Sequence, residues 1–229
     1  MNSNSKSTWT QISPQINRVI SWGAGDQCKV NMPILRSMNV EIVAFIDEKK
    51  YMLSPIKSVP LFSSLADFTK TFPLDKRMHL GSVIAIGNPF GVKRTQYTEL
   101  LEKLGINALS FADPTSRIRD DVLFGKGLQV MPGATVCNNV RIGNNCIINT
   151  NALVEHDCIL MDATEIGPGA ILTGRVTVNA NAWIGAGAVV LPRLTIGKNS
   201  IVGAGAVVTK DVPENVVVVG SPARILRNL

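Results

Sequence analysis

The stretch that decides the fold runs from Ile166 to Val208 and reads IGPGAILTGRVTVNANAWIGAGAVVLPRLTIGKNSIVGAGAVV. An aliphatic residue returns in it at every sixth position. Traced back toward the N-terminus, the same spacing begins at Ile118 and covers sixteen consecutive positions, all of them Ile, Val, Leu or Phe. Neither an α-helix nor an alternating strand has a period of six, whereas a hexapeptide-repeat β-helix does.

Each hexapeptide supplies one short strand and one corner of a triangular prism. The aliphatic residue fills the prism axis, and an uncharged residue four positions later, often Ala, Val or Cys, lets the chain turn. Three hexapeptides make one coil of about 18 residues, so equivalent residues of successive coils stack on one another. Sixteen hexapeptides predict slightly more than five coils.

The preceding part of the chain has a different pattern, in which short apolar strands alternate with helical segments. This alternation predicts βαβ units and a parallel sheet. We expect a polar extension over residues 1–17, an α/β domain over 18–111 and a β-helix with a C-terminal tail over 112–229. Within the α/β domain the expected strands are Arg18–Trp22, Glu41–Ile46 and Ser82–Ile86, and the expected helices are Lys29–Met38, 61–72 and Arg94–Leu104.

Composition narrows the functional classes. The chain has 229 residues, of which 45% are apolar and 17% charged, which excludes a wholly disordered protein. No apolar run approaches the length of a membrane span, and the polar start is not a secretory signal. The net charge of +6 comes without a Lys/Arg run interleaved with aromatics, so no nucleic-acid partner is expected. Four cysteines without CxxC spacing favour reduced thiols in the cytoplasm.

Several segments, from both halves of the chain, resemble one family. These segments are Val19–Val30 (VISWGAGDQCKV), Ala44–Glu48 (AFIDE), Val83–Asn88 (VIAIGN), Asn149–Cys158 (NTNALVEHDC), Trp183–Val189 (WIGAGAV) and Val212–Arg224 (VPENVVVVGSPAR). Together they resemble the bacterial hexapeptide-repeat sugar acetyltransferases, which include bacillosamine and perosamine N-acetyltransferases and sialic acid O-acetyltransferases. The resemblance covers residues 18–229 and implies a Rossmann-like N-terminal domain, a left-handed β-helix, a homotrimer and acetyl-CoA as co-substrate.

Acetyl transfer to an amine needs a base, because the acceptor loses a proton as it attacks. Of the two histidines, His79 precedes a strand, whereas His156 lies two residues after the axial Val154 and is expected to point outward at a corner. One coil above it stands Gly174, which leaves room for a substrate. The resemblance gives the orienting carboxylate to Asp157, with Glu155 as the alternative. It also places Asn149 near the base.

The donor site is expected along one edge of the prism, where Gly and Ala recur in blocks spaced by one coil. The same small residues can also be required simply to turn the corners. In the resembled family acetyl-CoA lies along this edge, between subunits of a trimer. The implied contacts are Glu165, Gly174, Gly185, Ala186, Gly203 and Ala204, although relatives often have histidine at the position of Glu165.

The acceptor site is expected at the ends of the N-terminal strands. Gly23 and Gly25 follow a strand and precede a helix, where backbone amides can face a pyrophosphate. Asp47 and Glu48 end the second strand and can accept sugar or ribose hydroxyls, and Arg94 could approach a phosphate. The remaining expected substrate contacts are Asp26, Gln27 and Gly87, with Asp26-Gln27-Cys28 standing where relatives have Gly-His-Gly.

The resemblance therefore implies an N-acetyltransferase for a nucleotide-linked 4-amino-4,6-dideoxy sugar of a surface glycan such as O-antigen. O-acetylation of a sialic-acid-like sugar is the alternative, and a non-catalytic β-helix module is a further one. A β-helix carbonic anhydrase needs three zinc-binding histidines, and the repeats contain one. No metal site and no membrane partner are expected.

Overall fold

The computed structural model describes residues 16–49, 52–77 and 79–229, which form two compact units that divide between Phe111 and Ala112. Each unit has a hydrophobic core of its own. Most of the predicted extension 1–17 lies outside the described residues.

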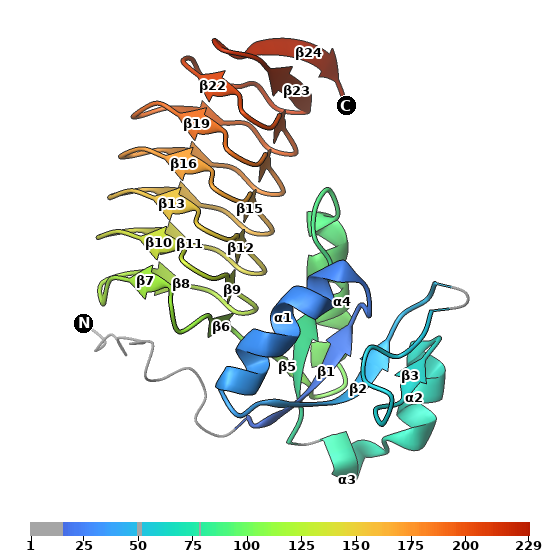
Figure 1. The fold of residues 1–229 in the computed structure, drawn as a ribbon. Helices are drawn as coiled ribbons and strands as arrows, with labels where there is room; N and C mark the ends of the chain where they lie inside the picture. Colours follow the sequence, from blue (N-terminus) through green and yellow to red (C-terminus); the bar gives the residue numbers. More distant parts are fainter. Residues whose placement is uncertain (1–15, 50–51, 78) are drawn as a thin grey trace, which may run out of the picture. The chain divides into compact units, whose positions relative to one another are not determined.

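The first unit is built on a five-stranded parallel sheet with the order β3-β2-β1-β4-β5 (Figure 1). Its central strands are apolar on both faces, which is typical of a parallel sheet with helical connections. The elements in chain order are β1 (Arg18–Trp22), α1 (Asp26–Ser37), β2 (Glu41–Ile46), β3 (Leu61–Phe62), α2 (Leu65–Thr71), α3 (Leu74–Arg77), β4 (Gly81–Ile84), α4 (Gly91–Glu102) and β5 (Asn107–Ala108).

The alternation of strands and helices matches the prediction, but several boundaries differ. The segment 61–72 was expected to be one helix, and the structure divides it into β3 and α2. The helix cannot begin earlier because Ser64 caps it, with its hydroxyl accepting a hydrogen bond from the amide of Asp67 (3.1 Å). Helices α1 and α4 each begin three residues before the predicted position. The short elements α3 and β5 were not predicted, since four or two residues carry no periodicity.

The second unit is a parallel β-helix made of two-residue strands. They stack into three sheets in which each strand pairs with its equivalents in the neighbouring coils, as Val154 pairs with Val136 and with Leu172. Figure 1 shows one of these sheets as the stack of β7, β10, β13, β16, β19 and β22. Its strands are Arg117–Ile118, Thr135–Val136, Leu153–Val154, Ile171–Leu172, Val189–Val190 and Val207–Val208.

Two further sheets complete the prism. The five strands of the second are β8 (Leu123–Phe124), β11 (Arg141–Ile142), β14 (Ile159–Leu160), β17 (Thr177–Val178) and β20 (Thr195–Ile196). The eight strands of the third are β6 (Phe111–Ala112), β9 (Gln129–Val130), β12 (Ile147–Ile148), β15 (Glu165–Ile166), β18 (Trp183–Ile184), β21 (Ile201–Val202), β23 (Val216–Val219) and β24 (Arg224–Asn228). Strand β24 pairs antiparallel with β23 and ends the stack.

The predicted register is confirmed. Each of the sixteen aliphatic positions is the second residue of a two-residue strand, and from Val130 to Val208 all of them are buried. Ile118 and Phe124, in the first coil, are partly buried against the same core. Parallel sheets built from hexapeptides in this register fit a left-handed β-helix.

Candidate active site

His156 stands at the corner between β13 and β14, in the turn that follows the axial Val154. Its side chain is 54% exposed, so it points away from the core as predicted. The next residue, Asp157, has φ of +60°, a left-handed conformation that aspartate tolerates better than most residues. The corner thereby presents the histidine and a carboxylate side by side.

The ring of His156 is oriented by Asp157. Its Nδ1 lies 2.8 Å from Oδ2 of Asp157. Because an ionised carboxylate can only accept, Nδ1 carries the proton in this pair, and the Nε2 lone pair is left free to act as a base. The carboxylate of Glu155 instead accepts a hydrogen bond from the backbone amide of His156 (3.1 Å). Of the two carboxylates that flank the histidine, the structure pairs Asp157 with the ring.

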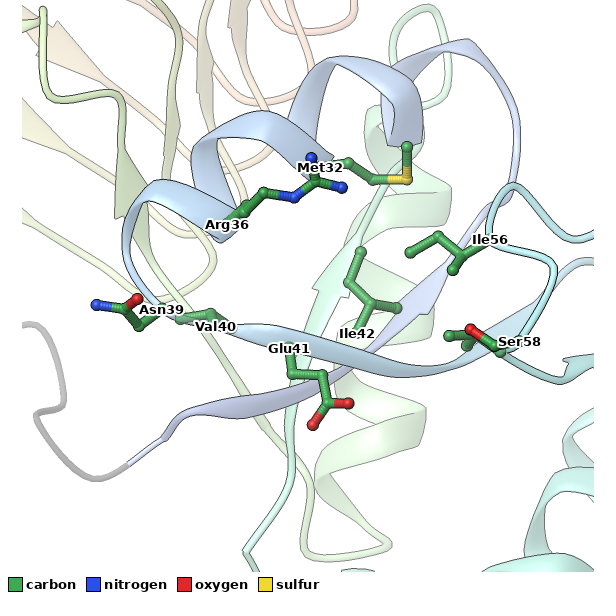
Figure 2. A pocket seen from close by; sticks show the side chains of 9 residues that line it. Met32, Arg36, Asn39, Val40, Glu41, Ile42, Ile56 and Ser58 are labelled. Carbon is green, nitrogen blue, oxygen red and sulfur yellow. The ribbon is translucent and has the colours of Figure 1, made fainter.

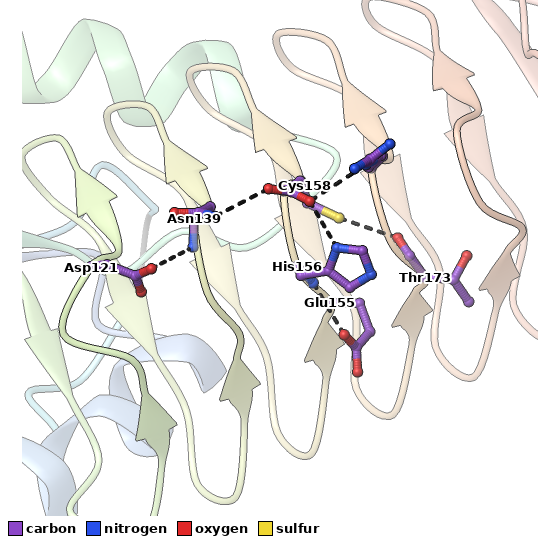
Figure 3. A network of polar contacts seen from close by, with 8 residues as sticks. Asp121, Asn139, Glu155, His156, Cys158 and Thr173 are labelled. Atoms are coloured by element: carbon purple, nitrogen blue, oxygen red, sulfur yellow. Dashed lines mark hydrogen bonds and ion pairs between the residues drawn. The ribbon is translucent and has the colours of Figure 1, made fainter.

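Asp157 is held by residues from the coils on either side. Figure 3 shows Asp121, Asn139 and His156 on successive coils. The side-chain Nδ2–H of Asn139 donates to Oδ1 of Asp157 (3.3 Å). The backbone N–H of Asn139 donates to Oδ2 of Asp121 (3.0 Å). Arg175 donates Nε–H to Oδ2 (3.4 Å). The hydrogen bond from His156, together with those from Asn139 and Arg175, lowers the pKa of Asp157 below its ordinary value. The carboxylate is therefore ionised at neutral pH.

Gly174 lies directly over the imidazole of His156. A Cβ at this position would stand only 2.5 Å from Nε2. The equivalent positions of other coils carry Asn138, His156 and Pro192, so the coil backbone itself accepts side chains there. The glycine is required by the ring beneath it, because a side chain here would collide with the imidazole. Sequence analysis placed Gly174 one coil above His156, which the structure confirms. It also counted Gly174 among the donor contacts, and that assignment remains a prediction.

We expect Gly174→Ala to lower kcat by roughly 100-fold, the scale of losing a positioned base, because the methyl group forces the ring away from its present orientation. Steady-state turnover measures the effect. In a His156→Ala background the same substitution is expected to leave the melting temperature unchanged, since the ring that it meets is gone. A Gly174→Ala protein with normal kcat would contradict the placement of Nε2.

Asn149 lies at a different corner of the coil, directly after β12. Its Nδ2–H donates to Oε1 of Glu165 (3.2 Å), and its Oδ1 accepts from the amide of Thr150 (2.8 Å). Glu165 is buried, with 6% of its surface exposed. The structure therefore brings Asn149 together with Glu165, a predicted donor contact. Within one chain Asn149 and His156 stand at opposite ends of β13.

The predicted donor edge is the corner after β15, β18 and β21. Ala186 and Ala204 are exposed there, which gives a shallow edge of small side chains. Packing between neighbouring coils also explains why positions 185 and 203 are glycine, since a side chain at Gly185 or Gly203 would meet the next coil. A Cβ on Gly185 would lie 2.6 Å from the amide nitrogen of Ala204, and one on Gly203 would lie 2.7 Å from Val219. The glycines are thus required by the spacing of the coils, whether or not a ligand lies on the edge.

The residues predicted for the acceptor site gather around one cavity of about 530 Å³ in the first unit. It lies at the carboxyl ends of β1, β2 and β4, where parallel sheets usually bind ligands. All seven predicted residues line it: Gly23, Gly25, Asp26, Gln27, Asp47, Glu48 and Gly87. Trp22 and Tyr97, which stack with ring centroids 4.2 Å apart, form an aromatic wall that sequence analysis did not predict.

A second cavity of the same unit, of about 420 Å³, lies beside the start of β2 (Figure 2). Met32 and Arg36 of α1 border it together with Ile42 and Ile56. No residue predicted for a site lines this cavity.

Asp47 also has a structural contact that sequence analysis did not predict. Its Oδ2 accepts a hydrogen bond from the amide of Ala24 (2.9 Å), and its Oδ1 accepts from the amide of Lys49 (2.9 Å). The carboxylate therefore ties the glycine loop to the end of β2, and both oxygens are engaged by the backbone. Glu48 is the exposed carboxylate of the pair and accepts a hydrogen bond from the Tyr97 hydroxyl (3.2 Å).

Gly23 is fixed by the same loop geometry. Its φ is +101°, and a Cβ would lie 2.5 Å from the carbonyl oxygen of Ala85. The suggestion that Arg94 approaches a phosphate is wrong. Its side chain is fully buried and donates to the carbonyl of Ile86 (3.2 Å) and to Oδ1 of Asn88 (3.4 Å), so it braces the segment after β4.

Comparisons with known proteins identify the repeats first. Residues 139–174 and 175–210 match the family described as bacterial transferase hexapeptide (six repeats). The GDP-perosamine N-acetyltransferase of Escherichia coli O157:H7 is 36% identical over 101 residues, which are 44% of this chain and 45% of that protein. The match thus spans less than half the length of this curated relative.

Solved structures match over nearly the whole chain. The perosamine N-acetyltransferase of Caulobacter crescentus, solved with CoA and GDP-perosamine as a variant with one histidine changed to asparagine, is 31% identical with a TM-score of 0.83. The alignment covers 93% of this chain and 98% of that one. WeeI from Acinetobacter baumannii AYE is 35% identical with a TM-score of 0.81, over 91% and 99% of the two chains.

The chain belongs to the hexapeptide-repeat sugar acetyltransferases. A further member with the same fold is the acetyltransferase domain of PglB from Neisseria gonorrhoeae FA1090, solved with acetyl coenzyme A. It is 26% identical with a TM-score of 0.81, and the alignment covers 92% of this chain and 99% of that one.

Two of the cysteine thiols are made less reactive by their surroundings. Burial raises the pKa of the Cys158 thiol to about 11, and burial, reinforced by Glu155, raises that of Cys137. Both thiols are therefore poor nucleophiles at neutral pH. Among residues 16–49, 52–77 and 79–229 there is no cluster of three His, Cys, Asp or Glu that could hold a metal ion. None of the helices described is long and apolar enough to cross a membrane.

Proposed function

We propose that this protein transfers an acetyl group from acetyl-CoA to the amine of a nucleotide-linked 4-amino-4,6-dideoxy sugar, in the biosynthesis of a surface glycan such as O-antigen. The observation that carries the proposal is the exposed His156–Asp157 pair, in which the carboxylate binds Nδ1 and leaves Nε2 as the basic nitrogen. The relatives support it, since the Caulobacter crescentus enzyme is a perosamine N-acetyltransferase solved with CoA and GDP-perosamine.

In this proposal His156 carries one proton from the acceptor amine to the leaving thiolate. Acetyl-CoA supplies the acetyl group as a thioester. As the amine nitrogen forms its bond to the acetyl carbon, Nε2 of His156 accepts the proton that the nitrogen loses. Asp157 stabilises the resulting imidazolium, since its carboxylate already accepts from Nδ1 (2.8 Å). The proton then leaves Nε2 for the departing sulfur, so the products are the acetamide and the free thiol, and His156 is neutral again.

The first unit supplies the acceptor site in this proposal. The sheet order β3-β2-β1-β4-β5 supports the proposal that this unit is a Rossmann-like domain, and the cavity lies where the strand order reverses, between β1 and β4. The glycine loop and the aromatic wall of Trp22 and Tyr97 suit a nucleotide, whose base has a flat apolar face. The exposed Glu48 can accept a hydroxyl hydrogen of the ligand, and each oxygen of Asp47 keeps a second lone pair besides the one that binds the backbone.

Asp47→Asn is expected to raise KM for the sugar nucleotide about tenfold while kcat changes less than about twofold. An asparagine places an N–H group against one of the two backbone amides that the carboxylate now accepts, which loosens the loop at a cost of about 1–3 kcal/mol. Steady-state kinetics with varied acceptor measures this. Glu41→Gln, an exposed carboxylate at the other end of β2, is the matched control. An unchanged KM would show that the loop does not hold the acceptor.

The donor is proposed to lie along the edge of Gly185, Ala186, Gly203 and Ala204, reached also by Glu165. A single edge leaves one side of the donor open, and we propose that a second copy of the chain closes it in a homotrimer. The outward residues of β13, β16, β19 and β22 support such assembly, because they form an apolar, half-buried stripe: Leu153, Ile171, Val189 and Val207. In a trimer Asn149 of one copy can approach His156 of another. Sedimentation measures the assembly.

A cytoplasmic location is part of the same proposal. The four cysteines are free in the structure, as expected of a reducing compartment.

A panel of nucleotide-linked sugars incubated with acetyl-CoA tests the function, with thiol release and product mass as readouts. The panel contains GDP-, UDP- and dTDP-linked 4-amino-4,6-dideoxy sugars, the matching 4-hydroxy sugars and a sialic acid. Acetylation of an amino sugar, but not of its 4-hydroxy partner, is the expected result. Acetylation of the sialic acid or of the hydroxy sugars would replace the proposal by O-acetylation, and no transfer to any of them would contradict it.

A further inference from the structure

Arg175 and His156 share one acceptor atom. Oδ2 of Asp157 lies 2.8 Å from the ring Nδ1 of His156 and 3.4 Å from Nε of Arg175. Because both nitrogens contact the same oxygen, their separation is well below the Debye length at physiological salt. At such a short separation a permanent cation changes the balance between neutral and protonated imidazole.

The stacking of the β-helix explains how Arg175 reaches the pair. Asn139, Asp157 and Arg175 occupy the same left-handed turn position of three successive coils, with φ values of 58°, 60° and 64°. The amide of Arg175 donates to the carbonyl of His156 (2.9 Å), which locks the two coils together at this corner. The carboxylate is thus held from below by an uncharged amide and from above by a guanidinium.

The other charged groups around His156 make different contacts from that of Arg175. Glu155 accepts from the backbone amide of His156 rather than from its ring. One coil below stands the weakly acidic thiol of Cys137, and the cation Arg119 lies a further coil below, close to that thiol. Asp121 reaches the pair only through Asn139. Among the residues that the structure describes, Arg175 is the cation in direct contact with the carboxylate that orients the base.

We infer that Arg175 is a positioning residue for the base: by competing with the imidazole for Oδ2 of Asp157, it holds the carboxylate in place and limits how strongly that carboxylate favours protonated His156. A histidine beside an unshared aspartate would remain protonated to a higher pH, so a smaller fraction of it would be available as a base near neutrality. With Arg175 present, Asp157 still orients the imidazole, but it favours the protonated form of His156 less strongly. The inference rests on the proposed function, in which neutral His156 accepts the proton.

An NMR titration of the histidine rings tests the inference without any turnover. The chain has only two histidines, so a His156→Ala spectrum assigns both, and His79 serves as the internal reference. In Arg175→Gln the pH midpoint of the His156 ring signals is expected to rise by about half a pH unit, the Coulomb effect of a unit charge at about 6 Å in a water-like dielectric. His79 is expected not to move, and Arg175→Lys is expected to stay near the wild-type midpoint.

Arg193→Gln is the matched control. Arg193 holds the same turn position one coil further, with φ of 62°, and its amide donates to the carbonyl of Gly174 as that of Arg175 does to His156. Its side chain has no hydrogen-bond or ion-pair partner among residues 16–49, 52–77 and 79–229, so its removal subtracts the same charge without touching Asp157. We expect a shift below about 0.2 pH units, since an exposed charge one coil further away is more strongly screened.

Activity then separates this inference from the proposed function. In an active enzyme the acidic limb of kcat/KM is expected to move with the NMR midpoint, so the kcat/KM of Arg175→Gln falls by up to about threefold relative to the wild type at pH 6 and matches it at pH 9. If the midpoint moves but no sugar is acetylated, the proposed function fails and the role of Arg175 toward His156 stands. A midpoint in Arg175→Gln that is unchanged, lowered, or shifted no more than in Arg193→Gln overturns the inference.

Discussion

Replacing His156 by alanine is expected to lower kcat at least about 100-fold, the usual scale for losing a general base, with little change in stability. The side chain is 54% exposed and leaves no cavity in the prism axis, so circular dichroism and the melting temperature should match the wild type. Thiol release at saturating acceptor and acetyl-CoA measures kcat. The KM values of both substrates are expected to change little, because the substitution removes a group that acts in the transition state.

His79→Ala is the matched control for this experiment. His79 is the only other histidine, lies in an exposed turn before β4 and belongs to the other unit. Its removal is expected to leave kcat within about twofold of the wild type. Near-normal turnover of His156→Ala would remove His156 from the mechanism, whatever its hydrogen bond to Asp157.

The position of His156 could be predicted because the residues of a β-helix repeat with a fixed spacing. Once the sixfold register is known, every residue has a defined place on an axis, a face or a corner, and His156 falls at an exposed corner. The same spacing predicted that Gly174 lies above His156, and in the structure a Cβ added to Gly174 would lie only 2.5 Å from Nε2. What the register could not supply is the direction of a side chain within a turn. Glu155 and Asp157 both flank the histidine, and only the left-handed turn at Asp157 distinguishes them.

The residues that hold Asp157 were missed, although the register contained the signal. Asn139 stands one coil before Asp157 and Arg175 one coil after it, so stacking alone places both beside it. Their chemistry, an amide on one side and a guanidinium on the other, could have been read as a hydrogen-bonded column. Stacking does not reveal that both reach the same carboxylate, because long side chains at a corner can also turn into solvent.

The acceptor cavity was predicted by a topological rule rather than by contacts. Residues at the carboxyl ends of parallel strands meet at one edge, and all seven predicted residues do so. The roles of individual residues were less predictable. Asp47 binds Ala24 because the glycine loop passes close to the end of β2, and Arg94 is buried because α4 begins three residues earlier than expected. Such features depend on loop geometry, for which a single sequence carries no periodic signal.

The largest effect on stability is expected from Val178→Asp, which should destabilise the β-helix by at least about 4 kcal/mol and prevent accumulation of soluble protein. Val178 is the second residue of β17, is fully buried and packs in the core that runs through all the coils. An aspartate there places a carboxylate on an axis lined by aliphatic side chains. Because each coil rests on its neighbours, one disrupted layer interrupts the stack above and below it.

Thr177→Asp is the matched control, since it introduces the same carboxylate one residue away on the same strand. Thr177 points outward and is only partly buried, so its substitution is expected to change the free energy of unfolding by less than about 1 kcal/mol. The soluble yield of both variants gives the first comparison, and chemical denaturation of the soluble protein, followed by circular dichroism, gives the free energy of unfolding. A Val178→Asp protein that is soluble and unfolds like Thr177→Asp would mean that position 178 does not face the axis, and the register that places His156 at its corner would be wrong with it.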